Sequence, residues 1–268
     1  MKRSVFLPLC WIALSVWLPV FGQATAHATV AVSNAPNRVL TCLLRGIEHD
    51  QKPVWLFPLH AAEGQHWRAV IPFIAATAAL VELDPHDAPY FRRSTRFEEF
   101  NEDFSSVNTG LAIGLFPVGL YLAGVERHSS YAERSALLAS EALVDAEIVS
   151  EVMKNVDRRL RPRQIPPNGD FGDTWFRQGG GLLISNGSFP SGHSIGSFAV
   201  AAVIADRYRS HHWVPWLAYG MAALIGGSRI TLQAHFPSDI FAGGVLGYAI
   251  GHFVVTRRHE SPSTADCI

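Results

Sequence analysis

Long apolar stretches separated by short polar connections run through most of the chain. Between Tyr131 and Arg159, apolar side chains recur at helical spacing among Glu and Asp residues, so one face is apolar and one is polar. We expect a helix there that packs on other helices. The remaining predicted helices are Trp67–Leu83, Thr109–Val125, Gly192–Tyr208, Trp213–Arg229 and His235–Arg257. No long stretch alternates as a strand does, so the pattern predicts an all-α bundle of about six helices.

The segments between these helices have a different character. Residues 84–103 are charged and rich in Phe, which favours a loop or a broken helix. Residues 162–188 contain Pro-Pro, Asn-Gly and Gly-Gly-Gly and predict a long loop. We divide the chain into a signal peptide (1–28), a surface or interfacial segment (29–66), a helical domain (67–258) and a polar tail (259–268).

The N-terminus has the composition of an export signal. Lys2 and Arg3 precede an apolar run, and small residues around Ala26 suit cleavage. An uncleaved membrane anchor is the alternative. Of the 3 cysteines, one would leave with the signal; whether Cys42 and Cys267 pair stays open.

Composition narrows the function classes. Hydrophobic residues make up 48% of the chain and charged residues 17%. This hydrophobic content is high for a soluble protein and low for a bundle that lies wholly in lipid. The net charge of −1 offers no general attraction to nucleic acid, so we expect no nucleic-acid partner. No Cys/His spacing is typical of a metal site, so we expect no metal.

Residues with candidate chemistry gather at the ends of predicted helices. Lys154 and Arg161 are seven positions apart, two helical turns, and can project from one face. The turn that contains Ser191, Gly192 and His193 precedes an apolar helix, whose first-turn N–H groups and dipole can bind an anion. A histidine there can transfer a proton to that anion.

A second group of such residues lies near the last predicted helix. Arg229 closes the preceding helix, and His235 and Asp239 follow. If the last two share a helix, they lie on one face, and the carboxylate can accept a hydrogen bond from one ring nitrogen. The other ring nitrogen then points outward as a nucleophile.

Three motifs result: Lys154-x6-Arg161-Pro162, Pro190-Ser191-Gly192-His193 and Ser228-Arg229-x5-His235-x3-Asp239. Together they resemble those of the type 2 phosphatidic acid phosphatase (PAP2) superfamily, which also includes bacterial class A acid phosphatases and vanadium haloperoxidases. The resemblance is complete at every motif position. It implies a PAP2-like phosphatase domain with its active site at one end of the core helices.

The resemblance also implies roles. His235, held by Asp239, would attack phosphorus and form a phosphohistidine, and His193 would protonate the leaving oxygen. The phosphoryl oxygens would be held by Lys154, Arg161, Arg229 and the N–H groups near Ser191 and Gly192. These cations supply the positive charge that Mg²⁺ brings elsewhere, so no cofactor is expected.

We therefore predict a phosphatase that hydrolyses phosphate monoesters or diphosphates of lipids, embedded in the bacterial inner membrane with its site facing the periplasm. The basic residues at the other helix ends follow the positive-inside tendency. This topology needs Thr109–Val125 and Tyr131–Arg159 to span, with Trp67–Leu83 interfacial or buried. Three alternatives stay open: a soluble periplasmic acid phosphatase of broad specificity, a vanadate-dependent haloperoxidase, and a non-catalytic membrane protein that binds phosphate or headgroups. The particular lipid and the oligomeric state stay open too.

Overall fold

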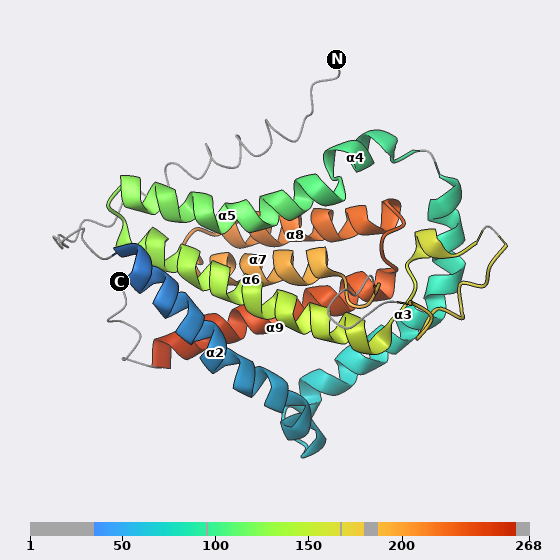
Figure 1. Ribbon diagram of the computed structural model, residues 1–268, viewed down its shortest axis with the longest axis horizontal. Helices are drawn as coiled ribbons and strands as arrows, with labels where there is room; N and C mark the ends of the chain where they lie inside the picture. The colour runs from blue at the N-terminus through green and yellow to red at the C-terminus, as the bar shows by residue number, and fades with distance from the viewer. Residues whose placement is uncertain (1–34, 95, 167, 180–186, 261–268) are drawn as a thin grey trace.

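The computed structural model describes residues 35–94, 96–166, 168–179 and 187–260. Within these residues all regular secondary structure is helical, which confirms the predicted all-α fold (Figure 1). The elements are α2 (Ala35–Ala62), α3 (Trp67–Arg93), α4 (Glu98–Asp103), α5 (Ser106–Glu126), α6 (Ser130–Asp157), the 3₁₀ helix η2 (Pro162–Gln164), α7 (Gly192–Arg207), α8 (Trp213–Thr231) and α9 (Pro237–Glu260). The predicted signal peptide and Cys267 lie outside the described residues.

Helix α7 lies in the middle of a bundle that α5, α6, α8 and α9 complete (Figure 1). Its side chains are apolar or small on every face, and most are buried, as expected for a helix with neighbours all around. Ile195 and Val203 of α7 are fully buried in a core cluster that also contains Ala139 of α6 and Val254 of α9. This arrangement fixes the first turn of α7 at one end of the bundle.

Glycines let α9 approach α7 at backbone contact. A Cβ on Gly247 would lie 2.1 Å from the Ile195 carbonyl oxygen, and one on Gly251 would lie 2.4 Å from that of Ala199. Only glycine fits at such distances, and small residues of this kind favour close helix packing. The contact places the start of α9 beside the start of α7.

The N-terminal third is more helical than the sequence indicated. Residues 35–62 form α2, although Pro53 and Pro58 lie inside it, and α3 continues ten residues past Leu83 to Arg93. Tertiary contacts outweigh the proline signals here. On α2, Gln51 donates to Asp145 of α6 at 2.7 Å and Asp50 pairs with Arg257 of α9.

Three of the described helices, α3, α5 and α9, are long and apolar enough to cross a membrane. Only 6% of the most apolar window of α3 is buried, so the prediction that Trp67–Leu83 is buried is wrong, and its interfacial placement stays a prediction. The predicted span Tyr131–Arg159 corresponds to α6, which is not among the three. Its acidic side chains, such as Glu141 and Asp145, lie inside the bundle instead.

Candidate active site

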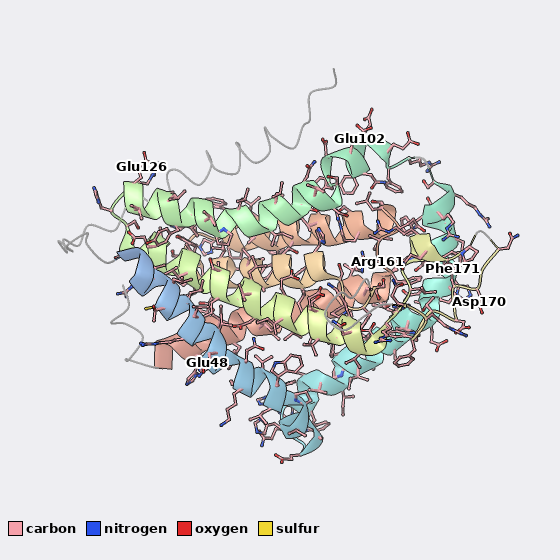
Figure 2. All side chains as sticks on the ribbon, in the orientation of Figure 1. Glu48, Glu102, Glu126, Arg161, Asp170 and Phe171 are labelled. Atoms are coloured by element: carbon pink, nitrogen blue, oxygen red, sulfur yellow. The ribbon has the colours of Figure 1, made fainter. Side chains whose placement is uncertain are left out.

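The predicted site residues come from α6, α7, α8, α9 and the segments beside them, and they meet at one end of the bundle. Figure 2 shows Arg161 at this end, far from Glu126 at the other. The Ser191 N–H donates to the Asp239 carbonyl at 3.1 Å, which joins α7 to α9. The Lys154 ammonium lies 3.0 Å from the point that a Cβ on Gly192 would occupy, which joins α6 to α7.

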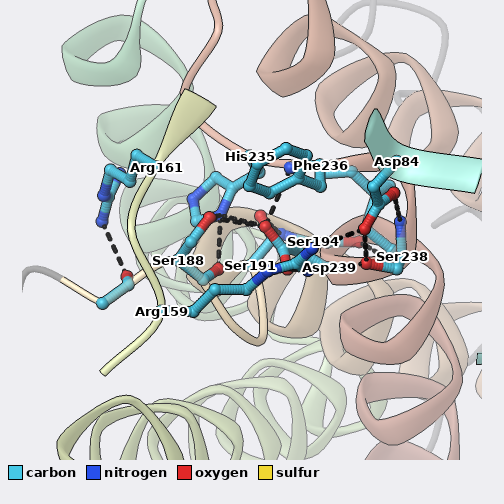
Figure 3. A network of polar contacts seen from close by, with 12 residues as sticks. Asp84, Arg159, Arg161, Ser188, Ser191, Ser194, His235, Phe236, Ser238 and Asp239 are labelled. Carbon is cyan, nitrogen blue, oxygen red and sulfur yellow. Dashed lines mark hydrogen bonds and ion pairs between the residues drawn. The ribbon is translucent and has the colours of Figure 1, made fainter. Parts of the chain in front are cut away.

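His235 is held by the chain segment in front of α7. It precedes α9, which begins at Pro237, so the expectation that His235 and Asp239 share one helix is wrong. The Nδ1 atom of His235 lies 2.6 Å from the Ser188 carbonyl and 3.6 Å from Asp239 Oδ2 (Figure 3). A carbonyl can only accept, so Nδ1 carries the proton and Nε2 keeps its lone pair.

Burial keeps His235 neutral. The ring is 3% exposed, and burial lowers its pKa to about 4. The nearby cations Arg161 and Lys154 contribute to this lowering of the pKa, and Asp239 acts in the opposite direction. A neutral imidazole with a free Nε2 lone pair is the form that can attack phosphorus.

Ser188 joins His235 to Asp239. Its hydroxyl donates to Asp239 Oδ2 at 2.5 Å, while its carbonyl accepts from the histidine ring. The backbone N–H of Phe236 donates to the same carboxylate oxygen at 2.8 Å. The expected direct bond between ring and carboxylate is therefore replaced by a bridge through Ser188.

The other oxygen of Asp239 binds Arg159. Arg159 Nη1 donates to Asp239 Oδ1 at 2.6 Å, and Nη2 donates to Asp84 Oδ2 at 2.6 Å (Figure 3). All three side chains are at most 1% exposed. The sequence analysis gave Arg159 no role of its own and placed Asp84 in a connection. The signal available was an acidic residue at the end of an apolar stretch, which a membrane helix seldom carries without a function.

Ser106, at the start of α5, joins His193 to Arg229. His193 Nε2 donates to the Ser106 carbonyl at 2.9 Å, and Arg229 Nη1 donates to the Ser106 hydroxyl at 3.0 Å. Burial lowers the pKa of His193 to about 4, with a contribution from the positive charges of Arg229, Lys154 and Arg161, while the hydrogen bond to Ser106 acts in the opposite direction. The sequence analysis missed Ser106, because nothing in its local pattern marks it.

Lys154 and Arg161 complete the cationic side of the site. Lys154 pairs with Glu151 at 2.7 Å, and Arg161 Nη2 donates to the Gly187 carbonyl at 3.3 Å. Burial and the neighbouring Arg163 lower the pKa of Arg161. The positive charges of Lys154 and Arg161 help to lower the pKa of both histidines.

The N-terminus of α7 is the remaining anion-binding element. The expectation for Ser191 needs a correction, because its N–H is taken by Asp239 and its hydroxyl accepts from Ser194 N–H at 3.4 Å. In the part of the chain that the structure describes, the N–H groups of Gly192 and His193 have no protein acceptor. Three cations, a helix N-terminus and two neutral imidazoles form a site suited to a phosphate group.

A family comparison agrees with this geometry. Residues 135–262 match the family model of the PAP2 superfamily. This part of the chain is similar to the PAP2 superfamily. All three motifs lie inside the matched PAP2 region, whereas Asp84 and Ser106 lie outside it.

Several curated proteins are similar to part of the chain. A lipid A 4'-phosphatase of Porphyromonas gingivalis is 30% identical over 119 residues, covering 44% of this chain and 48% of the relative. The bacitracin transport permease protein BcrC of Bacillus licheniformis is 31% identical over 116 residues (42% and 50%). A lipid A 1-phosphatase of Rhizobium etli is 33% identical over 108 residues (39% and 42%). The chain thus spans at most half the length of these relatives.

One solved structure is similar over most of the chain. It is a transmembrane PAP2-type phosphatidylglycerolphosphate phosphatase from Bacillus subtilis, 20% identical. The match covers 85% of this chain and 98% of that one, with a TM-score of 0.45.

Proposed function

We propose that this protein is a membrane phosphatase that hydrolyses phosphate monoesters or diphosphates of lipids through a phosphohistidine. The observation that carries the proposal is the buried, neutral His235, whose Nδ1 is held by Ser188 while cations and a helix N-terminus surround the same space. Such a site binds a phosphate and presents a nucleophile to it.

The reaction has two displacements. In the first, Nε2 of His235 bonds to phosphorus as the bond to the lipid oxygen breaks, and that oxygen takes a proton from His193. The phosphate of the substrate raises the pKa of His193 and so supplies the protonated form. In the second, water attacks phosphorus, His193 takes its proton, and the P–N bond breaks to release inorganic phosphate. The non-bridging oxygens are held by Lys154, Arg161, Arg229 and the N–H groups of Gly192 and His193.

The surface of the bundle supports a lipid substrate. Ile74 of α3 and Leu122 of α5 are about three-fifths exposed, on helices apolar enough to lie in a bilayer. Two of the similar proteins are named lipid A phosphatases, which act on a phosphorylated lipid. A soluble acid phosphatase of broad specificity would need a polar surface on these helices.

Phosphate release by the purified, detergent-solubilised protein tests the proposal. We expect release from lipid phosphates and diphosphates with EDTA present, and no release by His235→Gln. His212→Gln changes an exposed histidine outside the site and serves as the matched control. Wild-type turnover by His235→Gln, or complete loss of turnover with EDTA, would contradict the mechanism. Bromide oxidation with added vanadate would indicate the haloperoxidase alternative.

We propose that the site faces the periplasm. The helix ends opposite the site carry Arg127, Arg134, Arg207, Arg209 and Arg257. Arginine favours the cytoplasmic side of a membrane. The cluster from Arg158 to Arg163 at the site end is the exception, which phosphate binding explains. One observation favours the reverse orientation: α2 begins at this same end, and its Cys42 is disulfide-bonded, which is typical of an oxidising compartment.

Cysteine labelling separates the two orientations. Asp170 and Glu126 are exposed and lie at opposite ends of the bundle (Figure 2). A membrane-impermeant maleimide applied from the periplasm is expected to label Asp170→Cys and not Glu126→Cys. The reverse pattern would place the site in the cytoplasm.

A further inference from the structure

A buried chain of charges runs from α3 to the candidate nucleophile. Asp84, Arg159 and Asp239 are joined by two ion pairs of 2.6 Å, and Asp239 reaches His235 through Ser188 (Figure 3). Asp84 and the neighbouring Ala88 are the buried residues of α3, a helix otherwise turned outward. Asp84 therefore attaches this outward-facing helix to the site.

The guanidinium of Arg159 is fixed on all sides. Besides the two carboxylates it donates to Thr174 Oγ1 at 3.2 Å and to Ser238 Oγ at 2.7 Å. The rings of Trp175 and Phe236 lie 4.5 and 4.1 Å from its central carbon. Six polar and aromatic partners hold the guanidinium in one orientation, which an arginine that only neutralised a charge would not need.

The charges of this group do not cancel. Arg159 alone would neutralise Asp239, because the pair is in contact at 2.6 Å. Asp84 binds the other terminal nitrogen of the same guanidinium, so the three side chains together carry one negative charge. Asp84 also accepts from the N–H and the hydroxyl of Ser238, the residue before Asp239, and so fixes the start of α9.

That negative charge has a use in the reaction. When His235 attacks phosphorus, its ring changes from neutral to positive, and in a buried site a nearby negative charge stabilises that change. We propose that Asp84 and Arg159 are positioning residues for the proposed phosphatase: Arg159 orients Asp239, and Asp84 preserves the net negative charge that acts on His235. This inference rests on the proposed function for its kinetic part.

Three variants separate charge from architecture. Asp84→Asn keeps the shape of the side chain and removes its negative charge, so the charges of Arg159 and Asp239 then cancel. Asp84→Asn combined with Arg159→Gln restores one net negative charge on Asp239. Asp87→Asn, an exposed acid on the same helix, is the matched control. All three variants leave the other charged groups near Arg159 or His235 unchanged, namely Asp157, Lys154 and Arg161.

Steady-state kinetics give the first test. We expect Asp84→Asn to lower kcat about tenfold with little change in KM, because the phosphate ligands are intact. The double variant should recover kcat above that of Asp84→Asn, and Asp87→Asn should match the wild type. A purely structural role predicts the opposite order, with the double variant worst. Thermal unfolding of each variant shows which of them are folded.

A measurement without turnover gives the second test. NMR titration of labelled histidines, with His235 assigned from His235→Gln, reports the charge acting on the ring. We expect the pKa of His235 to fall in Asp84→Asn and to return in the double variant. If the wild type releases no phosphate but these shifts occur, the proposed function fails and the charge assignment stands. If turnover is present and Asp84→Asn leaves both kcat and the pKa unchanged, the positioning role is wrong.

Discussion

At the scale of single residues, the site depends on contacts that couple segments far apart in the chain. Ser188 is the clearest case: one residue accepts from the ring of His235 and donates to the carboxylate of Asp239. The spacing of His235 and Asp239 indicated that they act together. It could not show that Ser188 lies between them, because that contact depends on how α7 and α9 pack.

Removal of the Ser188 hydroxyl tests this bridge. In Ser188→Ala the carbonyl still holds His235, but a buried charge-assisted hydrogen bond to Asp239 is lost. Such bonds contribute about 1.5–3 kcal/mol, so we expect kcat to fall about tenfold or more with KM little changed. Ser197→Ala, which removes a buried hydroxyl in the second turn of α7, is the control. Equal kcat values for Ser188→Ala and the wild type would show that the Ser188 hydroxyl has no role in the reaction.

The protonation of His235 predicts the effect of acid on stability. Its folded pKa of about 4 is below the unfolded value of about 6.5, so the unfolded chain binds the proton first. The stabilisation is complete above pH 6.5 and is lost as the pH falls toward 4, by about 3 kcal/mol for this group. Unfolding in denaturant at pH 7 and pH 4.5 should show a smaller loss in His235→Gln than in the wild type. Equal losses would contradict the burial of a neutral ring.

At the scale of helices, periodicity found most of the core and failed in the N-terminal third. The predicted helix Gly192–Tyr208 corresponds to α7 within one residue, because its apolar run has a glycine and a capping serine at its start. Helix α2 was not predicted, since prolines interrupt a pattern that is only half apolar. Its helical form depends on packing against α6 and α9, which no local pattern contains.

The close contact between α7 and α9 predicts that one methyl group added at Gly247 lowers the stability of the protein. In Gly247→Ala the new Cβ would lie 2.1 Å from the Ile195 carbonyl oxygen, so α9 must move away from α7. We expect a loss of stability of about 1–3 kcal/mol and reduced turnover, because Asp239 starts the same helix. Gly220→Ala on α8 meets nothing within 4 Å and should leave the protein as stable or more so. Differential scanning calorimetry in detergent compares the two, and equal melting temperatures would contradict the packing described.

At the scale of the whole molecule, the sequence indicated a helical membrane bundle with a phosphate site at one end. The motif residues could be found because each motif occupies one short segment. Asp84 and Ser106 could not, because they come from α3 and α5 and reach the site only when the bundle closes. Helix packing also decides which segments can span: Trp67–Leu83 faces outward, whereas the acidic face of α6 is buried among other helices.

The outward apolar side chains predict how the protein fractionates. Membranes washed with alkaline carbonate should retain the full activity and the full chain, because α3, α5 and α9 are apolar along membrane-spanning lengths. Release of active protein into the wash would favour a soluble phosphatase.

The central claim is that phosphate passes through His235. Rapid acid-free quenching of the enzyme with a ³²P-labelled lipid phosphate, followed by peptide mapping, tests it most directly. The account predicts an acid-labile, alkali-stable label on the peptide that contains position 235. The label should be absent from His235→Gln, and from His193→Ala, which cannot protonate the lipid leaving oxygen. A label on any other residue, or turnover in the wild type with no covalent label at any time point, would contradict it.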